Sequence, residues 1–217
     1  MNQFLTALRA TGEPVRKSDL FGYLARLPRE VEFESVTEGP FVAVAATGAE
    51  TIRPLLGRFR HLIGAGDVRL DCREALLRSV GGTVDTSSDL QLVLAAIDAR
   101  GPDIIHELKG DFALVVWDAR AQKIVAARDA FGVKSLFMRR ADGLLLFASR
   151  ATTLATADGY NTDYLRDFLF GMPGCGQATA WQDVQRVEAG TVFQQRGTAG
   201  TVRTYWSAHD FQPAAER

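Results

Sequence analysis

Four short apolar stretches follow one another between residues 111 and 149, and turn-forming residues separate them. They read DFALVVWD, KIVAARD, SLFMRR and LLLFAS. Runs of this length, rich in Val, Ile, Leu and Phe, are typical of β-strands. The connecting segments Ala-Arg-Ala-Gln, Ala-Phe-Gly-Val and Ala-Asp-Gly are short enough for antiparallel hairpins. The pattern therefore predicts an antiparallel meander of four strands in this part of the chain.

Four further regions have the composition of strands. The segment FVAVAA at 41–46 is apolar on both faces and is predicted to be a buried strand. Residues 57–70 are interpreted as a strand, a glycine-containing turn and a second strand. Residues 191–206 are interpreted as a hairpin with its turn at Gly197 to Gly200. The apolar stretch FLTAL near the start is expected to form a strand as well.

Helical patterns lie before, between and after these strand regions. In the first, Leu20, Tyr23, Leu24 and Leu27 fall on one helical face. This first helix is expected to begin at Ser18-Asp19 and to end at Pro28, and a second is expected over CREALLRSVGG with Asp71 as its cap. A third is expected to begin at Ser88 or Asp89 and to end at Gly101-Pro102. A fourth is expected over YLRDFLFG, capped by Thr162-Asp163. Helix runs and strand runs are segregated, which predicts the α+β class with helices layered on antiparallel sheets.

The composition fits one domain that is not attracted to nucleic acid or membranes. The 217 residues carry a formal net charge of −1, so no electrostatic force favours nucleic acid or an anionic membrane. No run of about 18 apolar residues occurs, and Arg9 interrupts the first apolar stretch, which argues against a signal peptide. We therefore expect a cytoplasmic protein with a single domain over residues 1–217 and a fraying tail at about 208–217.

Metal and disulfide chemistry are not expected. The two cysteines, Cys72 and Cys175, have no metal-type spacing, and the three histidines lie far apart along the chain. The segment GAGD at 64–67 is too short for a phosphate-binding loop. The sequence thus predicts no metal site and no cofactor in this chain.

The strand region also contains a dense set of residues in a fixed order. They are Leu108, Gly110, Phe112, Trp117, Asp118, Ala127, Arg128, Asp129, Gly132, Lys134, Leu136, Phe147, Ala148 and Ser149. In this order they resemble the glutaminase domain of asparagine-synthetase-type class II glutamine amidotransferases. Ser135 and Arg150 depart from the family pattern, because proline and glutamate are usual there. The likeness continues through YLRDFLFGMP and Val184 to Trp206, so it covers nearly the whole chain.

A second segment narrows the resemblance. GDVRLDCREAL is similar to a form of the domain found in β-lactam synthetases and lasso-peptide cyclases. The resemblance implies an Ntn-hydrolase-type αββα sandwich. In active members the mature chain begins with a cysteine, whose thiol attacks the glutamine side-chain amide while its own α-amino group serves as the base. The released ammonia passes to a separate ATP-using synthetase domain.

A glutaminase of this kind needs a nucleophile, a base, an oxyanion hole and clamps for the ends of glutamine. Asn2 stands at or beside the nucleophile position, and an amide is not a useful nucleophile. The family's oxyanion motif aligns with residues 66–71, which places Gly66 at the asparagine donor and Asp67 at the following glycine. A carboxylate there would repel an oxyanion. The arginine that pairs the substrate carboxylate has no counterpart, since Arg29 lies in no matching motif.

One of the four elements is retained. Ser88-Asp89 matches the acidic residue that holds the substrate amine, and a plain helix N-cap is the alternative for Asp89. A structural role, stabilising a turn, is expected for Arg128, Asp129 and Lys134. The sequence therefore predicts no catalytic residue, and it leaves only Asp89 as a relic ligand-binding position.

The sequence also lacks the S-G-G-x-D-S loop that binds ATP in the family's synthetase half. ATP and Mg²⁺ are therefore expected only on a separate partner. The leading hypothesis is a catalytically inactive glutaminase-like domain that serves as a structural or partner-binding module. Its partner would be an asparagine-synthetase-like, ATP-dependent enzyme that forms amide bonds in peptide or secondary-metabolite biosynthesis. Homo-oligomerisation, and whether the chain is a separate or an excised half, stay open.

Four aromatic residues are candidates for the partner interface, with burial in the core as the alternative. They are Phe168, Phe170, Trp181 and Trp206.

Two rival hypotheses remain. One is a divergent amidohydrolase whose nucleophile is unmasked by processing, for instance at Thr6, Thr11 or Cys72. The other is a regulator that binds a small metabolite through Asp89. Core or surface positions are favoured for Cys72 and Cys175, because neither adjoins a histidine.

Overall fold

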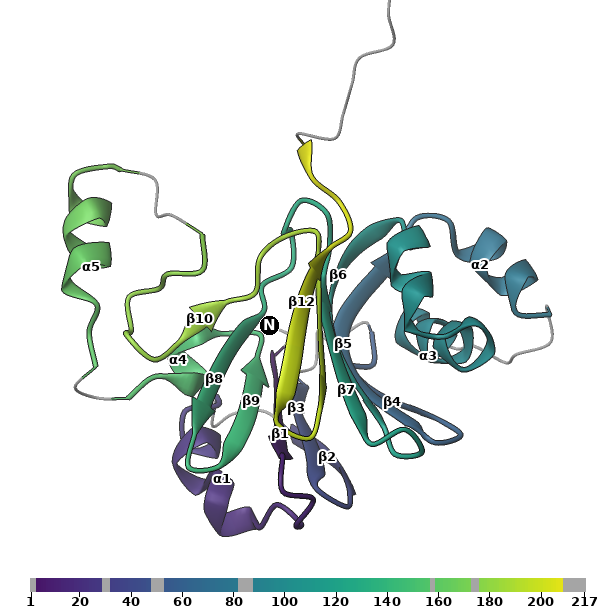
Figure 1. Ribbon diagram of the computed structural model, residues 1–217, viewed down its shortest axis with the longest axis horizontal. Helices are drawn as coiled ribbons and strands as arrows, with labels where there is room; N and C mark the ends of the chain where they lie inside the picture. Colours follow the sequence, from purple (N-terminus) through teal and green to yellow (C-terminus); the bar gives the residue numbers. More distant parts are fainter. Residues whose placement is uncertain are drawn as a thin grey trace, which may run out of the picture.

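Two six-stranded antiparallel sheets lie face to face at the centre of the molecule (Figure 1). The computed structural model describes residues 3–28, 32–47, 53–81, 88–156, 159–172 and 176–208. Sheet A has the strand order β10 (Gln185–Arg186), β8 (Phe137–Ala141), β9 (Leu144–Ala148), β1 (Gln3–Arg9), β3 (Phe41–Thr47) and β2 (Glu32–Glu38). Sheet B has the order β12 (Ala199–Thr204), β11 (Thr191–Arg196), β7 (Lys123–Arg128), β6 (Gly110–Asp118), β5 (Leu62–Leu70) and β4 (Leu56–Phe59).

Apolar residues from both sheets fill the space between them. Phe4, Phe41 and Phe147 of sheet A belong to the same buried cluster as Ala113 and Trp117 of sheet B. The rings of Phe41 and Trp117 stack with their centroids 6.1 Å apart. Because side chains alternate along a strand, the residues between these ones point to the outer faces of the sheets.

Helices cover both outer faces. The face of sheet B packs against α3 (Asp89–Arg100) and the short 3₁₀ helix η1 (Pro102–Glu107). The face of sheet A packs against α1 (Lys17–Leu24) and α4 (Ala151–Leu154). The layering confirms the predicted α+β class and the αββα sandwich.

The predicted meander is wrong at its middle connection. The strands themselves are present, but β7 pairs with β6 and β11 in sheet B, whereas β8 pairs with β9 and β10 in sheet A. The chain therefore crosses from one sheet to the other between residues 129 and 136. Asp129 fixes this crossover, since its carboxylate accepts hydrogen bonds from the backbone N–H groups of Phe131, Val133 and Lys134.

The turn inside 57–70 also differs from the prediction. The strands β4 and β5 are joined at Arg60 and His61, with Arg60 at a φ of 53°, and no glycine takes part. Gly64 lies inside β5 instead. A Cβ on Gly64 would lie 3.0 Å from Leu94 of α3, so a glycine there lets the helix approach the sheet closely. Similarly, the last hairpin turns at Gly197 and Thr198, and Gly200 lies within β12.

Helix boundaries differ from the predicted ones by a few residues. Asp71 pairs with Arg69 rather than capping α2 (Arg73–Ser79), whose N-cap is Cys72 without a side-chain hydrogen bond. The cap of α5 (Thr162–Leu169) is Asn161, whose Oδ1 accepts from the Tyr164 N–H at 3.1 Å.

The first helix likewise ends earlier than predicted. It stops at Leu24, although Leu20 and Tyr23 are buried as expected and Leu27 is buried beyond its end.

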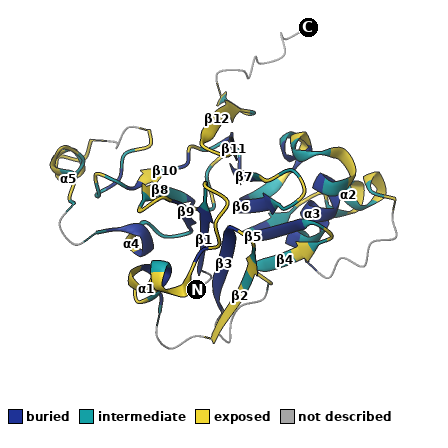
Figure 2. Cartoon of the chain, turned by 60° about the horizontal axis from the view of Figure 1, so that its bottom comes forward, coloured by how far each residue is buried: buried dark blue, intermediate teal, exposed yellow. Residues whose placement is uncertain are grey.

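Two helices contribute little to the core. Neither α2 nor α5 has a buried residue, and α5 stands away from both sheets at one edge of the molecule (Figures 1 and 2). Figure 2 shows the buried residues concentrated in the strands of the sandwich. Within the described residues, the structure contains no helix long and apolar enough to cross a membrane.

Candidate functional site

The residues aligned with the oxyanion motif, 66–71, begin in the middle of β5 and end just after it. The backbone N–H of Gly66 donates to the carbonyl oxygen of Leu55 at 2.8 Å, so this donor is already used. A Cβ on Gly66 would lie 2.7 Å from the carbonyl oxygen of Ala113 and 2.8 Å from the Cβ of Leu114. Only glycine fits here, and an asparagine side chain has no room in this backbone.

The negative charge of Asp67, the next residue of β5, is neutralised by a lysine from the crossover between the sheets. Its Oδ2 lies 2.8 Å from the Nζ of Lys134, and both side chains are mostly buried. Lys134 in turn belongs to the segment that Asp129 holds. The ion pair of Asp67 and Lys134 therefore links β5 to the crossover.

Asp89 stands at the first turn of α3, but it is not the cap. The Oγ of Ser88 accepts from the Gln91 N–H at 3.2 Å, which makes Ser88 the N-cap. The Oδ2 of Asp89 accepts from the Leu70 N–H at 2.9 Å, and its Oδ1 pairs with the guanidinium of Arg73. The N-cap alternative for Asp89 is thus wrong. Its carboxylate instead joins α3 to the end of β5 and to α2.

The remaining sequence candidates for a nucleophile or a substrate clamp lie in different parts of the chain. Asn2, Arg29 and Cys175 lie outside the described residues. Thr6 is fully buried in the middle of β1, paired with Ala43 and Phe147, and its hydroxyl has no hydrogen-bond partner among the described residues. Thr11 is exposed in the turn that follows β1.

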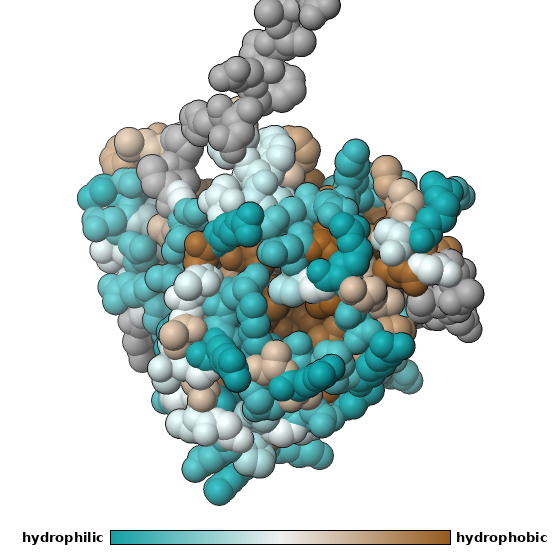
Figure 3. Space-filling model, turned by 45° about the vertical axis from the view of Figure 1, so that its right-hand side comes forward, coloured by the Kyte–Doolittle hydropathy of each residue, from teal (hydrophilic) through white to brown (hydrophobic). Residues whose placement is uncertain are grey.

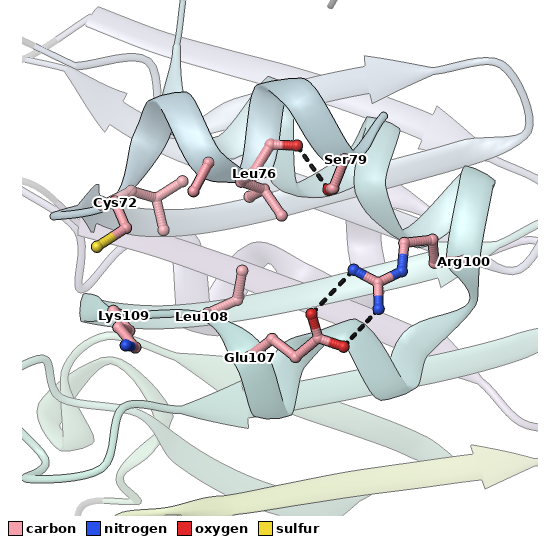
Figure 4. Close-up of a pocket in the computed structure, with 9 residues that line it drawn as sticks. Cys72, Leu76, Ser79, Arg100, Glu107, Leu108 and Lys109 are labelled. Carbon is pink, nitrogen blue, oxygen red and sulfur yellow. Dashed lines mark hydrogen bonds and ion pairs between the residues drawn. The ribbon is translucent and has the colours of Figure 1, made fainter. Parts of the chain in front are cut away.

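Cys72 lines a cavity of about 200 Å³ between α2 and the η1 segment. Figure 4 shows Cys72 and Lys109 at one end of this cavity and the ion pair of Arg100 and Glu107 at the other. No histidine lines it, so the thiol has no imidazole base beside it. Figure 3, which brings this side of the molecule forward, shows hydrophobic surface in hollows between hydrophilic residues.

The matching Arg128-Asp129 pair is a structural anchor. The guanidinium of Arg128 donates to the carbonyl oxygens of Lys134, Gly132 and Val187 at 2.6–2.8 Å. Burial lowers the pKa of Arg128. The phenol of Tyr205 donates to the carbonyl oxygen of Arg128 at 2.9 Å, and burial raises the pKa of Tyr205. Sequence reasoning missed this tyrosine, although it lies in the matching segment that ends at Trp206.

A second missed contact lies at the start of β1. The backbone N–H of Phe4 donates to the Oγ of Ser149 at 3.0 Å, which joins the first strand to the end of β9. The only signal in the sequence was that Ser149 belongs to the family pattern. Among the described residues, no group of three or more His, Cys, Asp or Glu side chains could hold a metal ion.

Comparison with known proteins gives one family. Residues 70–206 match the model of a family described as "Glutamine amidotransferase domain". Asparagine synthetase [glutamine-hydrolyzing] 1 of Bacillus subtilis is 28% identical over 148 residues, which are 66% of this chain and 23% of that protein. A probable asparagine synthetase of Dictyostelium discoideum is 38% identical over 78 residues, 36% of this chain and 14% of its own length.

Solved structures agree on the fold. Glutamine phosphoribosylpyrophosphate amidotransferase from B. subtilis superimposes with a TM-score of 0.60 at 17% identity, covering 94% of this chain and 49% of that one. The present chain spans less than a quarter of the length of the curated relatives that it matches.

Proposed function

The chain belongs to the glutamine amidotransferase domain family, and we propose that it is a member without glutaminase activity that binds a partner protein. The partner is an asparagine-synthetase-like, ATP-dependent enzyme that forms amide bonds in peptide or secondary-metabolite biosynthesis. In this proposal ATP and Mg²⁺ bind the partner, and both proteins act in the cytoplasm. The names of the relatives support the choice of partner.

Loss of catalysis is supported by the internal use of the site positions. Gly66 gives its N–H to Leu55, Asp67 is paired with Lys134, and Asp89 is paired with Leu70 and Arg73. A polar group committed to a partner inside the protein must break that bond before it can bind a substrate, which costs free energy. None of the three is free to stabilise an oxyanion or to hold the amine of glutamine.

The observation that carries the partner-binding proposal is the uncovered apolar side of α5. Phe168 and Leu169 at the end of α5 are 67% and 81% exposed, and Phe170 and Met172, which follow the helix, are 77% and 58% exposed. Aromatic side chains bury about 150–250 Å² each, so these four partly exposed side chains offer several hundred Å², on the order of half of the roughly 800 Å² per partner in a standard interface. Soluble monomers rarely leave such a patch in water.

The helix that carries this patch is stabilised locally. Asn161 caps its N-terminus, and Arg166 pairs with Asp163 and Asp167 on its polar side. At its C-terminus, Gly171 has a φ of 68° and the Met172 N–H donates to the Asp167 carbonyl oxygen, which is a Schellman ending. These contacts favour the helical backbone that carries the apolar side chains, which reduces the backbone entropy lost when a partner binds.

The sequence candidates for the interface are separated by the structure. Phe168 and Phe170 are exposed on this patch. Trp206 is partly exposed on the other side of the crossover, with its ring 4.8 Å from that of Phe131. Trp181 packs against the outer core of sheet A instead. We include in the proposed interface only the patch at the C-terminal end of α5, formed by Phe168, Leu169, Phe170 and Met172.

Calorimetric titration tests the interface. The chain is titrated with a purified asparagine-synthetase-like protein, and we expect the double variant Phe168→Ser, Leu169→Ser to bind at least tenfold more weakly. The control is Val202→Ser, because Val202 is similarly exposed but lies on the edge strand β12. Equal binding by the wild type and the α5 variant would refute the assigned interface.

A separate assay tests the loss of catalysis. The purified chain, with its mass measured to detect processing, is incubated with glutamine and ammonia is quantified. We expect no release above that of a sample without protein. Release that depends on a processed N-terminus or on Cys72 would favour the amidohydrolase hypothesis.

A further inference from the structure

The outer face of sheet A is only partly covered by helices. Its described helices, α1 and α4, have eight and four residues, and the side of the sheet formed by β2 and β3 lies beyond α1. A groove of about 300 Å³ runs between α1 and these two strands. In Figure 2, α1 and β2 stand on opposite sides of β3, and Val42 and Val44 of β3 line the groove.

The strand register gives the groove an apolar floor. Ser35 pairs with Val44 and Thr37 with Val42, so these four side chains share the face that lines the groove. Phe33, two residues before Ser35 on the same face, is 49% exposed. From the helix side, Leu20 and Leu24 close the groove. An apolar side chain that is half-exposed at the rim is available to cover an apolar ligand.

Two cations stand at one end of the groove. Arg16 and Lys17 are exposed at the start of α1 and line the groove, and no ion pair involves either side chain within the described residues. The nearest acid on the helix, Asp19, is already bound to the guanidinium of Arg9 at 2.6 Å and to the N–H of Arg16.

The acids of β2 do not cancel this positive charge. Glu34 points to the opposite face of β2, because it pairs with Ala45 of the inner core, and Glu32, two residues earlier on the strand, shares that face. Glu38 is paired with Arg58 at 2.8 Å. The groove therefore combines an apolar floor, two hydroxyl groups on one wall and a positive end.

We propose that this groove binds a small amphipathic carboxylate, such as a medium-chain fatty acid. The acyl chain lies on Val42 and Val44 beneath Phe33, and the carboxylate reaches Arg16 and Lys17. A volume of about 300 Å³ is at the small end of ligand pockets, which limits the ligand to one short chain. The site is separate from the positions aligned with the glutaminase centre, and it does not depend on the proposed partner.

Methyl NMR with octanoate as the probe tests the location. Octanoate is expected to shift the methyl signals of Val42, Val44 and Leu24. The signals of Leu76 and Leu108, which line the cavity beside Cys72, should stay unchanged. Shifts confined to Leu76 and Leu108, or no shift with millimolar octanoate, would overturn the proposal.

Calorimetry with matched ligands tests the chemistry. Butanoate should bind at least tenfold more weakly than octanoate, because each methylene transferred from water contributes about fourfold in affinity. Octylammonium, which has the same chain with the opposite charge, should not bind measurably. Equal binding of octanoate and octylammonium would refute a role for the two cations.

A charge-reversal pair completes the test. Arg16→Glu with Lys17→Glu should weaken octanoate binding at least tenfold, while thermal unfolding shows that the exposed substitutions leave the fold intact. The control Lys109→Glu reverses an exposed charge at the other cavity and should leave the affinity unchanged. A similar loss in both variants would show a general charge effect and contradict a defined site.

Discussion

At the scale of single residues, the charged side chains of the family pattern act on the backbone of this molecule. Asp129 accepts three backbone N–H groups, and Arg128 donates to three carbonyl oxygens. Each unpaired buried backbone group would cost about 1–3 kcal/mol. These residues therefore stabilise the crossover between the sheets, and the crossover places Lys134 beside Asp67. A pattern that identifies an enzyme family can thus persist for structural reasons alone.

Tyr205 extends this anchor and predicts a loss of stability at alkaline pH. Burial raises the pKa of Tyr205 above its ordinary value of 10.0. Above about pH 10 the unfolded chain loses a proton that the folded chain keeps, so the free energy of unfolding falls with rising pH by up to about 1.4 kcal/mol per unit. Below pH 10 both states are protonated and the contribution is fully present.

Urea unfolding between pH 8 and pH 11 measures this effect. Tyr205→Phe should lower stability at pH 8 by about 1 kcal/mol, since the hydrogen bond to Arg128 is lost, and should flatten the alkaline decline. Tyr160→Phe is the control, because Tyr160 is exposed. An unchanged pH slope in the Tyr205 variant would contradict the assignment.

The individual site residues could be predicted only in part. The sequence showed that Gly66 and Asp67 replace the family's oxyanion residues, but not that Leu55 and Lys134 occupy their polar groups. Those partners are distant along the chain, and only the fold brings them together. In the same way, Asp89 was recognisable as an acid at a helix start, while its bond to the Leu70 N–H depends on how α3 meets β5.

At the scale of elements, two helices that both carry leucine residues have opposite roles. Leu94 of α3 is fully buried against β5, and Leu169 of α5 is 81% exposed. Leu94→Ala should therefore cost about 2–5 kcal/mol, because it leaves a cavity in the core. Leu169→Ala should change stability by less than about 0.5 kcal/mol.

Chemical denaturation of the two variants provides the measurement. The comparison holds the chemistry of the substitution constant and varies only burial. If Leu169→Ala proves as costly as Leu94→Ala, the apolar side of α5 is covered in the free chain and is not a docking surface.

Elements were easier to predict than their pairing. The strands of the 111–149 region follow from local runs of apolar residues, which the sequence shows directly. Their distribution between two sheets does not, because a hairpin and a crossover both need a short connection rich in turn formers. Gly132 illustrates this: its φ of 66° suits either connection, and the hydrogen bonds of Arg128 and Asp129 decide between them.

At the scale of the whole molecule, the apolar contacts that stabilise the fold are concentrated in the sandwich. The helices α2 and α5 at its edges are attached more loosely. Three apolar clusters lie between the sheets, between sheet B and α3, and between sheet A and α1. The strands β5, β6 and β7 contribute to two of these clusters and are each paired on both sides. By contrast, α2 and α5 bury no residue.

Hydrogen exchange should report this difference in local stability between the central strands and the outer helices. Amides of β5, β6 and β7 are expected to open only with global unfolding, whereas those of α2 and α5 should exchange through local opening at much lower free energy. Adding the proposed partner should slow exchange in α5 and leave α2 unchanged, since only α5 presents the apolar patch. Equal slowing in both helices would indicate general stabilisation by the partner, and protection of α5 in the free chain would mean that its apolar side is already buried.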